Sequence, residues 1–153
     1  MNQIMQVCVT IRSKFDAIGG YLPQLGLRLF LAYEYGLSGI EKFNGTNWFA
    51  DIQSDLLFPF NHVAPAISWQ MATWFELLGP VALALGFATR FFSLSLIVLT
   101  VVAWAAVHAG NGYNVCDNGY KLPLMYLLMF IPLFFSGAGK ASLDHFIWNR
   151  ASK

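Results

Sequence analysis

The chain has 153 residues, of which 57% are hydrophobic and only 11% are charged, and its formal net charge is +1. An average soluble domain has about 25% charged residues, so this composition argues against a water-soluble protein and favours a membrane protein. Because basic and acidic residues nearly cancel, the chain also lacks the large basic surface that holds nucleic acid by its phosphates. The length predicts one domain, residues 1–153.

The first element predicted along the chain is an amphipathic helix at the N-terminus. Apolar residues recur at helical spacing from Ile4 to Ile18, and Arg12, Lys14 and Asp16 occupy the other face. The segment has no unbroken apolar run of the length that a signal peptide needs. We expect a helix at the membrane interface beside the first span, the alternative being a disordered tail.

Four apolar stretches follow, each long enough to cross a bilayer. They cover residues 24–43, 66–89, 91–108 and 122–139. Together they predict an all-α membrane protein, built as a four-transmembrane-helix bundle. The loop between the first two spans has apolar residues at helical spacing over 48–57, which predicts a short amphipathic helix on the outer surface.

The basic residues predict how the spans are oriented. One side of the spans holds Arg12, Lys14, Arg90, Lys140, Arg150 and Lys153, with Arg28 close by, whereas the other side holds only Lys42 and Lys121. The positive-inside rule then places both termini and the turn at Arg90 in the cytoplasm. The loops 44–65 and 109–121 face outward.

Two spans carry a carboxylate near the middle, Glu34 in the first and Glu76 in the second. A carboxylate at membrane depth costs on the order of 3 kcal/mol, so it faces protein or water and is a functional candidate. Counting from the span ends places both at similar depth, so in adjacent helices they would meet or share a proton. In the alternative reading, Glu76 is protonated and hydrogen-bonded to a neighbouring span.

Further polar residues accompany these two acids. The first span has one stripe with Glu34, Ser38 and Glu41 and a neighbouring stripe with Arg28, Tyr35, Gly39 and Lys42. One helix cannot hide both stripes from lipid, so the other spans must pack around it. In the second span, Pro80 has no N–H and therefore leaves the carbonyl of Glu76 without its usual helical partner.

The third span ends at His108, with Trp104 one turn below. A histidine can relay protons or bind a metal, although at a helix end it is often only a hydrogen-bonded interface residue. A soft-metal site would recruit His108, Cys116, Met71, Met125 and Met129, but these form no tight cluster, so we expect no metal site. The chain has no nucleotide-binding or covalent-haem motif.

An ordered set of motifs resembles the DoxX family. The motifs run from about Leu27 to Asp144 and read L-R-L-F-L-A-Y-E-Y-G-L-S-G-I-E-K-F, G-x-N-W-F-A-D-I-Q, E-L-L-G-P-V-A-L-A-L-G-F-A-T-R, A-V-H and G-x-G-K-x-S-L-D. The acidic first span is similar to that of one branch of the family. The resemblance implies a small four-span protein of the bacterial inner membrane. Some relatives are the membrane subunit of thiosulfate:quinone oxidoreductase, and others are linked with membrane-associated oxidoreductase complexes.

Several candidate residues match the family by position. They are Arg28, Glu34, Glu41, Lys42, Trp48, Glu76, Arg90 and His108. The match does not assign their individual roles.

The resemblance favours a quinone-linked oxidoreductase subunit whose electrons come from a membrane or periplasmic redox partner. The catalytic candidates are Glu34, Glu76 and His108, and the ligand-binding candidates are Arg28, Tyr35, Ser38, Glu41, Lys42, Trp48, Arg90 and Trp104. Two alternatives stay open. One is a binding or transport protein for a small molecule, a lipid or a metal, and the other is an assembly partner whose polar residues only hold helices together. Homo-oligomerisation is also left open.

Overall fold

The structure, a computed structural model, describes residues 3–151, and within them the chain folds into helices without any β-strand. The α-helices are α1 (Gln3–Gly19), α2 (Leu22–Asn44), α3 (Pro65–Leu85), α4 (Thr89–Ala103), α5 (Lys121–Ser136) and α6 (Leu143–Ala151). Shorter helical turns are η1 (Gln53–Asp55), η2 (Phe60–His62), the π-helical η3 (Trp104–His108) and η4 (Ala109–Asn111). The predicted all-α class is confirmed.

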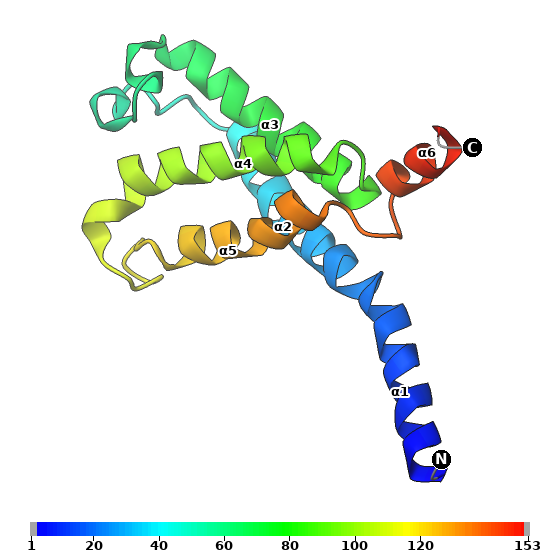
Figure 1. Ribbon diagram of the computed structural model, residues 1–153. Coiled ribbons are helices and arrows are strands. Elements are labelled where there is room, and N and C mark those ends of the chain that lie inside the picture. The colour runs from blue at the N-terminus through cyan, green and yellow to red at the C-terminus, as the bar shows by residue number, and fades with distance from the viewer. Residues whose placement is uncertain (1–2, 152–153) are drawn as a thin grey trace.

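Helices α2 to α5 pack around one another in chain order (Figure 1). α2 packs on α3 and on α5, α3 packs on α4, and α4 packs on α5. Each of these helices coincides with one of the four predicted apolar stretches to within a few residues. The N-terminal helix α1 is confirmed as a helix, and Figure 1 shows that it extends away from the other helices.

The helices differ in length and in how apolar they are, and both properties decide whether a helix can cross a bilayer. Among the described residues, one helical segment, residues 89–111, is both long and apolar enough to cross a bilayer. α5 is apolar but has only 16 residues, and α2 has 23 residues but includes Arg28, Glu34, Glu41 and Lys42. The fold is therefore consistent with a helical membrane protein, and the crossing of four helices stays a prediction.

The predicted amphipathic helix at residues 48–57 is wrong. The loop contains only the 3₁₀ turns η1 and η2, each of one turn. The side chain of Asn47 accepts a hydrogen bond from the backbone N–H of Phe49, at 2.9 Å. Such a local bond competes with helix formation. Leu56 is buried whereas Leu57 and Phe58 are exposed, so the apolar residues of this loop do not share one face.

The centre of the helix group is apolar, with one internal polar contact. Its buried residues are Leu31, Tyr35, Leu83, Leu96, Phe130 and Leu133, which come from α2, α3, α4 and α5. The hydroxyl groups of Tyr35 and Thr100 form a hydrogen bond, and Thr100 also donates to the carbonyl of Leu96 at 2.6 Å. Each buried hydroxyl in this pair is therefore satisfied.

Arg28 ties the ends of three segments together. Its guanidinium is 1% exposed and donates to the carbonyls of Leu83 and Ala84 at 2.7 and 2.8 Å, and to those of Ala138 and Ala141 at 2.8 Å. Leu83 and Ala84 lie in the last turn of α3, where the helix dipole is negative, and Leu83 also accepts a hydrogen bond from the N–H of Gly86 at 3.1 Å. Arg28 thereby joins α2 to the end of α3 and to the loop after α5.

Asp144 completes the same end of the molecule by capping α4. Its carboxylate accepts hydrogen bonds from the backbone N–H groups of Ala88 and Thr89, at 2.7 and 2.9 Å, and its own N–H donates to the carbonyl of Gly86 at 2.9 Å. Gly86 has φ of +67°, and a Cβ there would lie 2.8 Å from Cζ of Arg28. Only glycine fits this turn. The bonds of Asp144 join the S-L-D motif to the G-F-A-T-R motif next to Arg28.

We expect Arg28→Met to destabilise the protein strongly, because four carbonyls from the end of α3 and the loop after α5 would lose the guanidinium that joins them. Removal of one partner from a buried charged network costs about 3–5 kcal/mol, so the unfolding temperature in detergent should fall by about 10 °C. Circular dichroism during heating measures this change. Arg12→Met, on an exposed face of α1, is the matched control and should leave the temperature unchanged. Equal unfolding temperatures for the two variants would contradict the role given to Arg28.

Candidate functional site

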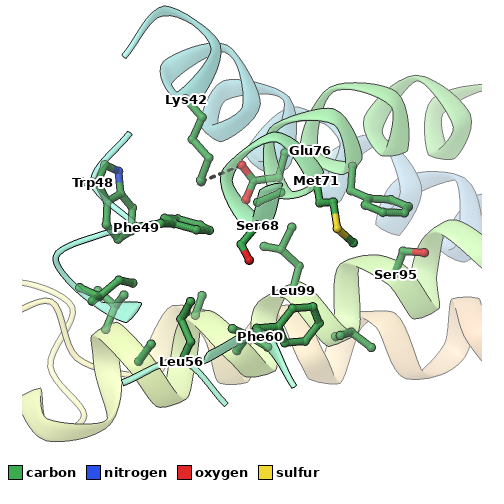
Figure 2. A pocket seen from close by; sticks show the side chains of 18 of the residues that line it. Lys42, Trp48, Phe49, Leu56, Phe60, Ser68, Met71, Glu76, Ser95 and Leu99 are labelled. Carbon is green, nitrogen blue, oxygen red and sulfur yellow. Dashed lines mark ion pairs between the residues drawn. The ribbon is translucent and has the colours of Figure 1, made fainter. Parts of the chain in front are cut away.

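A cavity of about 370 Å³ lies between α3, α4 and the loop that joins α2 to α3 (Figure 2). Its wall follows α4 and η3 from Phe91 to Val107, a length of about 24 Å at the helical rise. Most of the wall is apolar. The charged and hydroxyl-bearing side chains in the wall are Lys42, Ser68, Glu76 and Ser95. A long apolar space with a few polar groups is the usual form of a small-molecule site.

The strongest polar contact of the cavity joins α2 to α3. Nζ of Lys42 lies 2.7 Å from Oε2 of Glu76, and the two side chains are 16% and 3% exposed. Ser38 lies between them, because Lys42 donates to its hydroxyl at 3.0 Å and that hydroxyl donates to Glu76 at 3.2 Å. Figure 2 shows this pair at the edge of the cavity. A buried carboxylate is therefore held by one cation and one hydroxyl.

Close approach of the two backbones makes this pair possible. Pro80 lies inside α3 and removes the N–H that would otherwise pair with the carbonyl of Glu76. Gly39 of α2 faces that carbonyl, and a Cβ on Gly39 would lie only 2.6 Å from the carbonyl oxygen. The space that Pro80 leaves is thus filled by the backbone of α2. Lys42, one turn beyond Gly39, then reaches the carboxylate.

Aromatic side chains cover one end of the cavity. Trp48 and Phe49 from the loop pack edge-to-face on each other and on Trp69 of α3, with ring centroids 5.0 to 6.0 Å apart. Gln53 holds the loop in place by donating to the carbonyls of Asn61 and Val63, at 3.3 and 3.2 Å. Trp48 and Phe49 thus line the same cavity as the Lys42–Glu76 pair.

Ser68 is a cavity residue that sequence reasoning missed. Its side chain points into the cavity in Figure 2, the residue is 5% exposed, and its hydroxyl oxygen has no hydrogen-bond partner. A buried hydroxyl without a partner is costly, so this one is a free donor and acceptor for a bound molecule. The available signal was its position two helical turns before Glu76.

Glu34 lies in a different place from Glu76. Its carboxylate accepts a hydrogen bond from the hydroxyl of Tyr126 on α5, at 2.6 Å. The ring of Tyr126 packs on that of Tyr35, with centroids 5.7 Å apart. Each acid therefore has its own partner on a different neighbouring helix, and the structure does not bring the two carboxyls together.

The remaining candidates lie outside the cavity wall. Glu41 is exposed, and Arg90 is exposed and donates to the carbonyl of Phe135 at 3.1 Å. Nδ1 of His108 lies 2.8 Å from the carbonyl of Asn118. Trp104 stacks on Tyr120 with centroids 5.2 Å apart.

Of the residues proposed from sequence, the cavity therefore unites Lys42, Trp48 and Glu76, with Ser38 behind them, whereas Arg28 and Tyr35 belong to the core. Within residues 3–151, no three His, Cys, Asp or Glu side chains gather as metal ligands.

The DoxX family model matches residues 24–109, which include every residue of the cavity wall. The chain belongs to the DoxX family. Two proteins of Haemophilus influenzae are similar to it, and both are described as uncharacterized. One is 52% identical over 134 residues, which are 88% of this chain and 89% of that protein. The other is 32% identical over 127 residues, or 78% and 86%. No solved structure matches this DoxX protein.

We expect the two halves of the Lys42–Glu76 pair to be unequal when they are removed singly. Lys42→Met leaves a buried carboxylate without its cation and should cost about 3–5 kcal/mol. Glu76→Met should cost less, because the long side chain of Lys42 can move its charge toward the polar end of α2. The double variant should recover most of the loss. Thermal unfolding in detergent measures all three variants, and losses that simply add would show that the pair is not coupled.

We expect Gly39→Ala to push α2 away from α3 and to disturb the same pair. The new methyl would lie 2.6 Å from the carbonyl oxygen of Glu76, whereas Gly36→Ala, one turn earlier, would place its methyl at an ordinary 3.7 Å from Pro80. The first variant should lower the unfolding temperature, and the second should leave it unchanged or raise it, because alanine favours helix over glycine by about 1 kcal/mol. If both variants behave alike, the close approach at Gly39 is refuted.

Proposed function

We propose that this DoxX protein spans the bacterial inner membrane with α2, α3, α4 and α5, and that both termini lie in the cytoplasm. The distribution of basic residues supports this orientation. The partners found for Arg28, Glu34 and Lys42 support the crossing of α2, since each of these charges meets a protein group rather than lipid. With 16 residues, α5 reaches about 24 Å, which a locally thinned bilayer accommodates.

Within this arrangement the protein acts as the quinone-binding membrane subunit of a quinone-linked oxidoreductase system. The observation that carries this proposal is the buried Lys42–Glu76 pair in the wall of an otherwise apolar cavity. A quinone head has two carbonyl oxygens that need hydrogen-bond donors, and its tail needs apolar surface. Lys42 and Ser68 supply donors, and the wall along α4 supplies the apolar surface.

The residues of the site have separate tasks in this proposal. A bound quinone supplies two-electron chemistry, with two protons taken up on reduction. Lys42 donates to a carbonyl oxygen and stabilises negative charge on it, since hydrogen bonds from a cation are the stronger kind. Glu76 holds or releases a proton at Oε2, next to Ser38. Trp48 and Phe49 exclude water. Electrons come from a membrane or periplasmic redox partner.

We expect decylubiquinone to bind purified protein and to quench part of its tryptophan fluorescence, because Trp48 lines the cavity. Ser68→Ala should weaken binding about fivefold, the effect of one hydrogen bond, and Lys42→Gln about tenfold or more, because a charged donor is lost. Ser93→Ala is the matched control, since Ser93 also has a buried hydroxyl without a partner but does not line the cavity.

The head group decides between this proposal and a plain lipid-binding function. Decan-1-ol has the same ten-carbon chain and lacks the quinone. If decanol displaces decylubiquinone with equal affinity, the cavity recognises the chain alone and the quinone proposal fails. If Ser68→Ala and Ser93→Ala bind decylubiquinone with equal affinity, the ligand does not use Ser68.

A further inference from the structure

A second cavity, of about 640 Å³, lies at the N-terminal end of α4. Its wall comes from the turn between α3 and α4, the loop over residues 136–142 and the start of α6. Phe91 lines both this cavity and the apolar one described above. In the proposed orientation, this end of the molecule meets the cytoplasmic surface of the membrane.

Two permanent cations stand at this second cavity. Arg90 lines it and is positioned by its hydrogen bond to the carbonyl of Phe135 at 3.1 Å, while a guanidinium has five N–H donors in all. Lys140 also lines it, with its ammonium 5.6 Å from the ring centroid of Tyr21. The two side chains come from segments 50 residues apart in the sequence, so the fold itself brings them to one cavity.

A buried hydroxyl gives independent evidence for a ligand here. Thr89 lines the cavity, is 0% exposed, and its hydroxyl oxygen has no hydrogen-bond partner. Native proteins seldom leave such a group unpaired, and a bound acceptor would satisfy it. Thr89 directly precedes Arg90, so a cationic donor and a neutral donor adjoin in the sequence.

The acid in the wall does not cancel these cations. Asp144 uses both carboxylate oxygens to accept the backbone N–H groups of Ala88 and Thr89. Its single negative charge is thus matched by the start of α4, where the helix dipole is positive. The two cations therefore leave the cavity positively charged overall.

We propose that this cavity binds the phosphate group of an anionic membrane lipid through Arg90, Lys140 and Thr89. The exposed apolar side chains of Phe87, Phe91 and Ile147 at the same cavity provide surface for the acyl chains. This position favours a lipid over a soluble phosphate, because the latter would gain nothing from the apolar rim. The inference rests on the proposed membrane orientation and is independent of the proposed quinone chemistry.

Native mass spectrometry of the full chain in detergent tests the proposal, with dioleoyl phosphatidylglycerol as the anionic probe and dioleoyl phosphatidylcholine as the zwitterionic one. The wild type should retain phosphatidylglycerol in preference. The double variant Arg90→Gln/Lys140→Gln should bind it about thirtyfold more weakly. Thr89→Val, which keeps the backbone N–H used by Asp144, should weaken it about fivefold.

The control variant Arg12→Gln/Arg150→Gln removes the same charge from α1 and α6, away from the cavity wall. If this control loses as much phosphatidylglycerol as the double variant, binding reflects net charge only and the proposed site is refuted. Equal retention of the two lipids would also refute it. Displacement of phosphatidylglycerol by an equal concentration of inorganic phosphate would assign the site to soluble phosphate and overturn the lipid proposal. The circular dichroism spectrum of the double variant should match that of the wild type, which shows that it is folded.

Discussion

The approach of α2 to α3 at Glu76 is the constraint on which the candidate site depends. Glu76 has a backbone carbonyl that Pro80 leaves without its helical donor, and it has a buried carboxylate. The backbone of Gly39 on α2 packs against the carbonyl, and Lys42 on α2 pairs with the carboxylate. A buried ion pair is weak evidence of stability, because an apolar pair of similar volume often serves the fold as well. The fold alone therefore does not require charge here, and the adjoining cavity is what the charges are proposed to serve.

The charged residues of α2 serve two ends of the molecule in different ways. The N–H groups of Arg28 donate to four backbone carbonyls, so few are left to bind a ligand. Lys42 uses two of its three N–H donors on Ser38 and Glu76, which leaves one for a ligand in the cavity that it lines. Of two basic residues on one helix, Arg28 thus joins segments at one end and Lys42 is a candidate ligand-binding group at the other. Burial alone does not separate these roles, and only the partners do.

The helices were predictable from sequence because their apolar stretches are long and continuous, although α3 ends at Leu85, before the predicted end of its span at residue 89. The coincidence of Pro80 with Glu76 was also visible, because a proline acts on the residue four positions earlier. The residue that each acid contacts was not predictable, because a helical wheel shows which face of a helix a residue occupies and not which helix packs against that face. The helix predicted at residues 48–57 was wrong because apolar periodicity does not reveal the local hydrogen bond of Asn47 or the burial of Leu56.

The order in which the partners of α2 are synthesised has a consequence for biogenesis. In the proposed four-span arrangement, α2 reaches the insertion machinery before the groups that neutralise it exist. Glu76, the partner of Lys42, is synthesised with α3, and Tyr126, the partner of Glu34, is synthesised with α5. The last acceptors of Arg28, the carbonyls of Ala138 and Ala141, are synthesised later still. A helix with three uncompensated charges is poorly soluble in hydrocarbon. In that arrangement the nascent α2 is therefore retained at the translocon until α5 and the loop after it have been synthesised.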